Sequence, residues 1–243
     1  MKLIVEKNYE NISRTAANII ADKVLAKPGI VLGLATGSTP IGTYKELIKM
    51  YKEGILDFSE VRSFNLDEYV GLDENNPYSY RYFMNENLFD HINIKKENIH
   101  VPDGKAENMD EYCKDYDRLI EKAGGIDVQI LGIGENGHIA FIEPDTSLPI
   151  GTSVVELTED TIVVNSRFFN SVDEVPRTAV SMGIGSILKA KSILLLANGR
   201  RKADAINSIL ECERISTEIP ASFLLLHPDV TIIVDEEAYS KSK

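Results

Sequence analysis

One histidine in this sequence follows a glycine-rich turn and stands five residues before a glutamate. Residues 131–144 read LGIGENGHIAFIEP, with His138 directly after Gly137 and ahead of Glu143. Glycines let backbone N–H groups approach a ligand closely, because no Cβ intervenes. A histidine changes its charge near neutral pH, and a nearby carboxylate can orient its ring and tune that change. The stretch indicates acid–base chemistry beside a polar ligand, although a lone histidine of this kind can also be structural.

Two adjacent acids form a second candidate. Residues 64–72 read FNLDEYVGL, and Asp67 and Glu68 stand at the end of an expected strand. In an open sheet of parallel strands, catalytic groups gather at the carboxyl ends of the strands. Partial desolvation there would raise the pKa of an acid and make it a usable base towards a carbon acid. The alternative is that these carboxylates only cap a turn or a helix.

A third candidate is an anion site in residues 33–40, which read GLATGSTP. The small residues combine free N–H groups, side-chain hydroxyls and the start of a helix, which together bind phosphate well. Arg167, in NSRFF, and Lys202, in ANGRRKA, could supply the positive charge. The alternatives are an ordinary capped helix and two solvated basic residues.

Apolar runs of strand length alternate with helical patterns, and this alternation must position the three candidates. The expected strands are residues 2–6, 30–35, 61–67, 126–134, 192–199 and 230–235. After a first helical stretch around residues 12–24, the expected helices are residues 39–52, 78–89, 109–122, 183–189 and 202–211. The pattern predicts an α/β fold, a doubly wound and mostly parallel sheet flanked by helices, in a single domain over residues 1–243. Residues 145–175 are less regular and form either an active-site lid or a plain surface excursion.

Composition limits the classes of partner. The net charge of −12 argues against nucleic acid or a membrane surface as partner, whereas a local cluster of cations could still bind a small anion. Cys113 and Cys212 lack metal-ligand spacing and indicate reduced thiols, and no second histidine or cysteine near His138 suggests zinc. The chain shows no signal peptide or membrane span, so we expect a cytoplasmic protein.

Taken together, these motifs resemble the glucosamine-6-phosphate deaminase family over residues 1–234. The match is carried in order by GLATGSTP, FNLDEYVGL, PYSYRYFM, ILGIGENGHIAFIEP, NSRFF and PASFLLLHPDV. The related sugar-phosphate lactonases tend to have an Asp-Gly-His-Thr-Ala-Ser run and lack the Asp-Glu-Tyr segment. This chain has Gly-His-Ile-Ala-Phe and keeps Asp67-Glu68-Tyr69. The resemblance therefore favours an amino-sugar phosphate over a lactone as substrate.

The resemblance implies conversion of glucosamine 6-phosphate and water to fructose 6-phosphate and ammonia, a step of amino-sugar catabolism. It implies that His138 opens the pyranose ring with support from Asn136 and Glu143, and that Asp67 moves a proton from C2 to C1. The residues it implies for binding the phosphate are Gly37, Ser38, Thr39, Arg167 and Lys202. No metal or organic cofactor is expected. A non-catalytic sugar-phosphate sensor and a 6-phosphogluconolactonase-like hydrolase remain the alternatives.

Three departures from the family pattern carry expectations of their own. Asn136 stands where some members have aspartate, so it must act through hydrogen bonds. Ile142 stands where asparagine is usual, which removes a donor and an acceptor from the active-site turn. Some members are hexamers that bind N-acetylglucosamine 6-phosphate between subunits through basic residues, but residues 147–160 contain no lysine or arginine. We therefore expect a monomer or small homo-oligomer without that activation.

Overall fold

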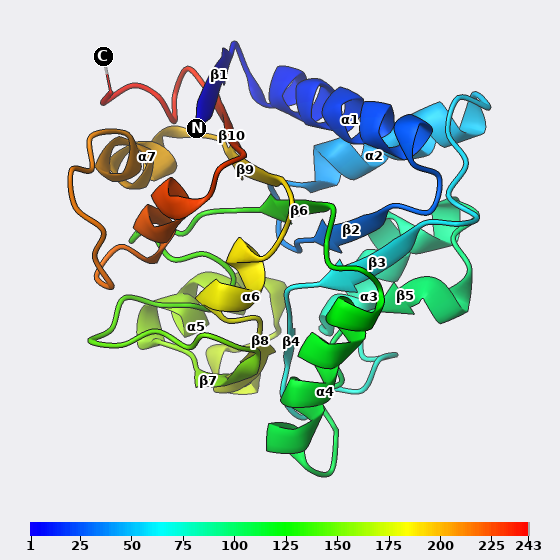
Figure 1. The fold of residues 1–243 in the computed structure, drawn as a ribbon. Coiled ribbons are helices and arrows are strands. Elements are labelled where there is room, and N and C mark those ends of the chain that lie inside the picture. The colour runs from blue at the N-terminus through cyan, green and yellow to red at the C-terminus, as the bar shows by residue number, and fades with distance from the viewer. Residues whose placement is uncertain (243) are drawn as a thin grey trace.

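The computed structural model describes residues 1–242 and contains two separate sheets (Figure 1). The larger sheet has seven parallel strands in the order β1-β10-β9-β6-β2-β3-β5. These strands are β1 Lys2–Glu6, β2 Val31–Leu34, β3 Arg62–Asn65, β5 Ile99–His100, β6 Val128–Leu131, β9 Ile193–Ala197 and β10 Val230–Asp235. The expected doubly wound parallel sheet is confirmed.

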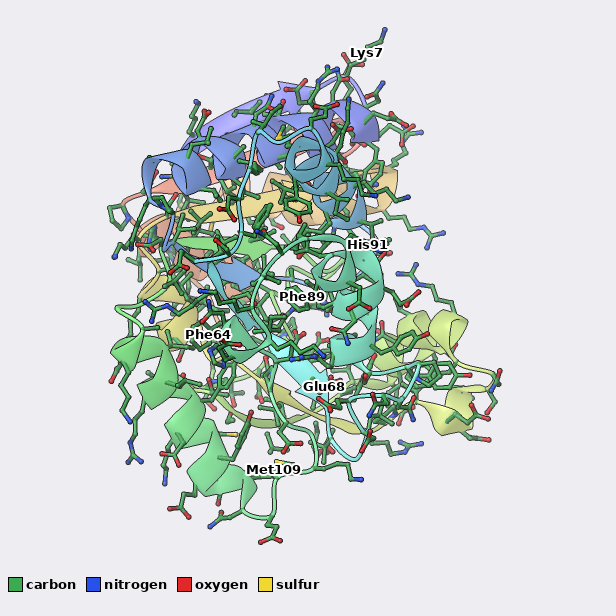
Figure 2. All side chains as sticks on the ribbon, turned by 90° about the vertical axis from the view of Figure 1, so that its right-hand side faces the viewer. Lys7, Phe64, Glu68, Phe89, His91 and Met109 are labelled. Atoms are coloured by element: carbon green, nitrogen blue, oxygen red, sulfur yellow. The ribbon has the colours of Figure 1, made fainter. Side chains whose placement is uncertain are left out.

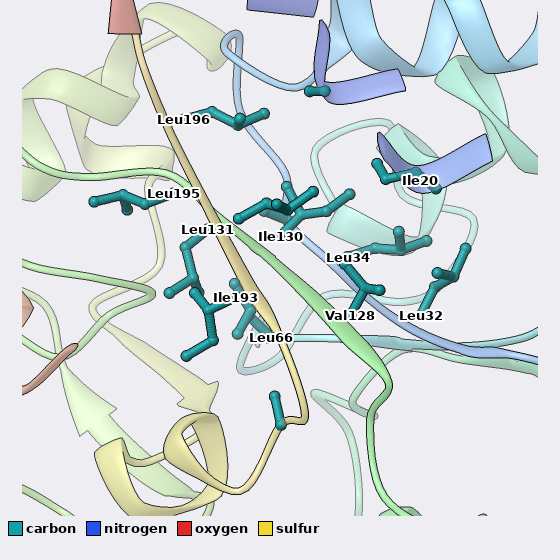
Figure 3. Packing of buried hydrophobic residues seen from close by; sticks show 14 of the residues in the cluster. Ile20, Leu32, Leu34, Leu66, Val128, Ile130, Leu131, Ile193, Leu195 and Leu196 are labelled. Atoms are coloured by element: carbon teal, nitrogen blue, oxygen red, sulfur yellow. The ribbon is translucent and has the colours of Figure 1, made fainter. Parts of the chain in front are cut away.

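The central strands are apolar because helices cover both faces of the sheet. Every residue of β2, β6 and β9 is buried, and Leu34, Ile130 and Leu195 belong to one continuous hydrophobic core (Figure 3). The covering helices are α1 Tyr9–Ala26, α2 Ile41–Lys52, α3 Tyr80–Asn87, α4 Met109–Lys122, α6 Ile184–Leu188 and α7 Ala203–Leu210. In Figure 1, α1 and α2 lie together above the sheet and α6 lies below it. Among residues 1–242, no helix is long and apolar enough to cross a membrane.

The second sheet was not predicted, and it corrects the expected strand 61–67. The chain leaves the parallel sheet at Leu66, and β4 Asp67–Tyr69 pairs antiparallel with β8 Thr178–Ser181, which pairs with β7 Ser153–Glu156. In Figure 2, Phe64 lies on β3, before the chain leaves the parallel sheet, and Glu68 lies on β4, after it has left. A run of strand-like residues such as VRSFNLD does not reveal where a strand changes partners, so the prediction merged two strands. Asp67 therefore begins a strand of the small sheet and does not end a parallel one.

Residues 145–175 are more ordered than we expected. They contain β7, the helix α5 Glu159–Asn165, and two short 3₁₀ turns, Ser166–Phe168 and Val172–Glu174. Thr158 caps α5, because its hydroxyl accepts a hydrogen bond from the backbone N–H of Thr161 at 3.2 Å. This segment thus presents a defined helix to the edge of the larger sheet.

Candidate active site

Three loops that leave the carboxyl ends of parallel strands surround a cavity with a volume of about 840 Å³. The loops follow β2, β6 and β9, and residues of β4, α3 and α5 complete the wall. Strand β2 lies between β3 and β6, where the order of strands along the chain reverses direction. Ligands of doubly wound sheets bind at such a switch point. Residues predicted from five separate stretches of sequence line this cavity together, namely Gly37, Ser38, Thr39, Asp67, Asn136, His138, Arg167 and Lys202.

The turn after β6 holds the ring of His138 against the backbone of Gly134. The N–H of Gly134 donates to the carbonyl oxygen of His138 at 2.8 Å, and Gly137 adopts a φ of 86° that favours glycine. A Cβ added at Gly134 would lie 2.3 Å from ring atoms Nδ1 and Cε1 of His138. The glycine at position 134 is therefore needed for this close approach of the ring.

Glu143 lies beside this ring, as the spacing predicted. Its Oε1 is 3.2 Å from Nδ1 of His138, a close contact that is not aligned as a hydrogen bond. Its Oε2 accepts a hydrogen bond from Nδ2 of Asn136 at 2.8 Å, and the hydroxyl of Thr161 donates to Oε1. Burial alone would raise the pKa of Glu143, but His138, Thr161 and Asn136 stabilise the carboxylate and lower that pKa to about 2. The histidine therefore faces an ionised partner.

Asn136 contributes hydrogen bonds to both members of this pair. Besides its contact with Glu143, its Oδ1 accepts a hydrogen bond from the backbone N–H of His138 at 3.2 Å. Ile142, the other departure, is only 1% exposed and packs in the hydrophobic core. It does not line the cavity, so this isoleucine does not remove a polar group from the cavity wall.

The two adjacent acids have different surroundings. Glu68 accepts hydrogen bonds from the backbone N–H groups of Tyr69, Tyr80 and Arg81, each at 2.9 Å, and so caps the start of α3. Asp67 lines the cavity, is 6% exposed, and accepts no side-chain hydrogen bond from residues 1–242. Burial, and then the charge of Glu68, raise the pKa of Asp67 to about 8. Asp67 is the acid that is free to accept a proton from a ligand.

The loop after β2 forms one end of the cavity. Gly37 has a φ of 89°, and the hydroxyl of Thr39 donates to Oδ1 of Asn198 at 3.0 Å, which joins this loop to the one after β9. Within residues 1–242, no backbone hydrogen bond uses the N–H groups of Gly37, Ser38 or Thr39. These groups precede α2 and are available to an anion.

Basic residues lie along the same end of the cavity. Arg167 and Lys202 were predicted, and the structure adds Arg200 and Arg201, which the sequence motif contained but which we did not single out. Burial lowers the pKa of Lys202, the charges of Arg167 and Arg201 lower it further, and Glu135 opposes them. A cluster of like charges in a protein of net charge −12 is stabilised when an anion binds. Among the described residues, no group of three or more His, Cys, Asp or Glu side chains could hold a metal ion.

Replacing Lys202 with alanine should mainly weaken substrate binding. Loss of one hydrogen bond to a charged group corresponds to about a ten- to hundred-fold rise in KM, with kcat within about three-fold of the wild type. Steady-state kinetics check this, with Lys189→Ala as a control, because Lys189 lies outside the cavity and pairs with Glu121 on the surface. An equal fall in kcat with KM unchanged would show that Lys202 acts in the chemical step instead.

This fold and cavity define a known class. The chain belongs to the family of glucosamine-6-phosphate isomerases and 6-phosphogluconolactonases, whose model matches residues 5–233. It is 59% identical over 240 residues to the glucosamine-6-phosphate deaminase of Thermoanaerobacter pseudethanolicus, covering 99% of this chain and 94% of that protein. It is 56% identical to the glucosamine-6-phosphate deaminase of Clostridium perfringens, over 98% of both chains.

Solved structures distinguish the two branches of this family. A monomeric glucosamine-6-phosphate deaminase superposes with a TM-score of 0.96 at 46% identity, over 99% of this chain and 100% of that one. The 6-phosphogluconolactonase of Thermotoga maritima has a TM-score of 0.76 at 20% identity, over 96% of this chain and 98% of that one. The second likeness is one of fold alone. The deaminase branch is therefore much closer in sequence, as the motifs predicted.

Proposed function

We propose that this protein converts glucosamine 6-phosphate and water to fructose 6-phosphate and ammonia. One observation carries the proposal. The carboxylate of Asp67 is buried, accepts no hydrogen bond from a described side chain, and lines the same cavity as His138 and the basic end formed by Arg167 and Lys202. A base for a carbon acid, an acid–base group and an anion site are the three parts that this isomerisation needs. The high identity to named deaminases supports the same substrate.

The proposed steps assign one role to each part of the cavity. Gly37, Ser38, Thr39, Arg167 and Lys202 bind the phosphate. His138, oriented by Glu143 and Asn136, protonates the ring oxygen as the bond between that oxygen and C1 breaks and the C1 hydroxyl loses its proton.

Asp67 then acts on the open chain. It removes the proton from C2, and the electron pair forms a C1–C2 double bond as the aldehyde oxygen takes up a proton. Return of a proton to C1 gives an imine at C2. Water adds to C2, the C–N bond breaks, and ammonia leaves. The reaction involves no net oxidation or reduction. The steps assigned to residues of this chain are therefore proton transfers.

Product analysis tests the function. Purified protein treated with a chelator should release ammonia and fructose 6-phosphate in equal amounts from glucosamine 6-phosphate. Binding of the substrate without turnover would identify a sugar-phosphate sensor. Hydrolysis of 6-phosphogluconolactone without deamination would identify a lactonase. Either of these outcomes would overturn the proposal.

Residues 147–160, which follow the turn that carries His138 and Glu143, bear on the assembly and the regulation of the protein. We propose a monomer or small homo-oligomer, because residues 147–160 contain no lysine or arginine to bind a phosphate at a subunit contact. A monomeric deaminase with a TM-score of 0.96 supports this proposal. A single domain over residues 1–243 and a cytoplasmic location are further proposals. The single domain rests on one large hydrophobic cluster that includes residues from Ile12 to Ala238. The location rests on two unpaired cysteines, Cys113 and Cys212.

N-acetylglucosamine 6-phosphate should therefore leave the kinetics unchanged. We expect hyperbolic dependence of rate on substrate concentration with and without this compound, because residues 147–160 contain no lysine or arginine to bind its phosphate. Steady-state curves together with a sedimentation mass measure both properties. A sigmoidal curve that the compound makes hyperbolic, in a hexamer, would contradict the prediction.

A further inference from the structure

A hydroxyl group from α5, in the candidate lid of residues 145–175, contacts the pair formed by His138 and Glu143. Thr161 lies on α5, is 7% exposed, and donates its hydroxyl hydrogen to Oε1 of Glu143. A carboxylate only accepts hydrogen bonds, so the direction of this bond is determined. The same Oε1 lies 3.2 Å from Nδ1 of His138. Oε1 of Glu143 therefore contacts both the hydroxyl of Thr161 on α5 and the ring of His138.

This contact differs from the others that Glu143 makes. Asn136 and His138 belong to the same turn as Glu143, whereas Thr161 is eighteen residues away along the chain. Among the described residues, Thr161 is the one outside the turn that donates a hydrogen bond to this carboxylate. A threonine within a helix can bond to the carbonyl oxygen four residues earlier. Thr161 instead directs its hydroxyl at the partner of His138.

A second residue of α5 faces the same way. Asn165 follows Thr161 by four residues, so the two side chains share one face of the helix. Asn165 donates through Nδ2 to the hydroxyl of Tyr69 at 2.9 Å. Thr161 and Asn165 both line the cavity. Tyr69 belongs to β4, which begins at Asp67. Two contacts thus connect α5 to Glu143, the partner of His138, and to Tyr69 on the strand that begins at Asp67.

We propose that Thr161 is a positioning residue, whose hydroxyl holds the carboxylate of Glu143 at the ring of His138 and so couples the position of α5 to ring opening. This inference rests on the proposed function, because it concerns the step assigned to His138. A lid helix that is displaced takes the hydroxyl with it, and Glu143 then loses one of its hydrogen bonds. Glu143 has all of its hydrogen bonds beside His138 only when α5 lies against the cavity.

Three variants separate this role from simple packing. Thr161→Val keeps the branched shape and removes the hydroxyl, and we expect kcat to fall about ten- to hundred-fold with KM within about three-fold, the size for a lost bond to a charged group. Thr161→Ser keeps the hydroxyl and should restore kcat to within about three-fold of the wild type. Glu159→Gln is the control on the same helix, because Glu159 is exposed, pairs with Arg177 on the surface and does not contact Glu143. Its kcat should stay within about three-fold.

A double-mutant cycle tests the route of the effect. If Thr161 acts through Glu143, then Thr161→Val should change kcat by less than about two-fold in the Glu143→Gln background. Effects that multiply in the double variant, an unchanged kcat in Thr161→Val, no restoration by serine, or an equal loss in Glu159→Gln would each overturn the inference. Release of ammonia and fructose 6-phosphate by the wild type is measured first. An inactive wild type would overturn the proposed function and this inference together, whereas an active one with any of those four results would overturn this inference alone.

Discussion

Asparagine in place of Asp67 is expected to lower kcat by ~10²–10⁴-fold, the usual cost of losing a general base. The substitution keeps the shape of the side chain, and the proposed phosphate site lies on other loops, so the Kd for substrate should stay within about three-fold. Rapid-mix kinetics and equilibrium binding measure the two quantities separately. Turnover close to that of the wild type would move the base elsewhere. Glu68 is adjacent in sequence, but its oxygens already accept three backbone hydrogen bonds.

The same substitution has a consequence for stability that depends on pH. Burial raises the pKa of Asp67 from 3.8 to about 8, so the folded protein holds a proton that the unfolded chain releases. The stability that this proton contributes is fully present below pH 3.8 and is lost as the pH rises through about 8. We therefore expect Asp67→Asn to raise the Tm relative to the wild type at a pH above 8 more than at a pH below 4. Over the same range, kcat/KM of the wild type should increase as Asp67 ionises.

Replacing His138 with glutamine should also lower kcat by ~10²–10⁴-fold, but for a different reason. Glutamine can form hydrogen bonds but cannot exchange a proton near neutral pH, so the pyranose ring would not be opened. Opening and reclosing of the ring interconverts the α and β anomers of the substrate even when no proton leaves C2. Loss of catalysed interconversion is therefore specific for the role of His138.

The Asp67→Asn variant is the matched control for this measurement. It should still interconvert the anomers, because the pair of His138 and Glu143 is intact, whereas His138→Gln should not. Exchange spectroscopy by NMR on the two anomeric protons measures both rates in the same buffer. A His138→Gln protein that accelerates interconversion as the wild type does would assign ring opening to another group.

Much of the larger sheet was predictable, because its signals are local. Residues 2–6 and 230–235 were predicted as strands and 109–122 as a helix, and the structure has the same bounds. The buried runs of β2, β6 and β9 are continuous and apolar, which is typical of central parallel strands. The small sheet was missed because β4 has three residues and its partners are distant in the chain. Such pairing depends on tertiary contacts that the sequence pattern does not encode locally.

The candidate site divides in the same way. The nearness of His138 and Glu143 was predicted because a glycine turn connects them over five residues. The place of Asp67 in the cavity was predicted, although the strand that carries it was wrong. Thr161 was missed, because its contact with Glu143 requires α5 to fold back over the turn. The shared face of Thr161 and Asn165 was a signal of spacing that could have indicated this contact.

Proton exchange at C2 tests the assignment of Asp67 most directly. Glucosamine 6-phosphate is incubated in D₂O with the Asp67→Asn variant, and the C2 proton and the two anomers are followed together by NMR. We predict that the anomers interconvert while the C2 proton stays in place and no fructose 6-phosphate forms. Loss of the C2 proton to solvent at the rate found with the wild type would contradict the account, because another group would then be the base.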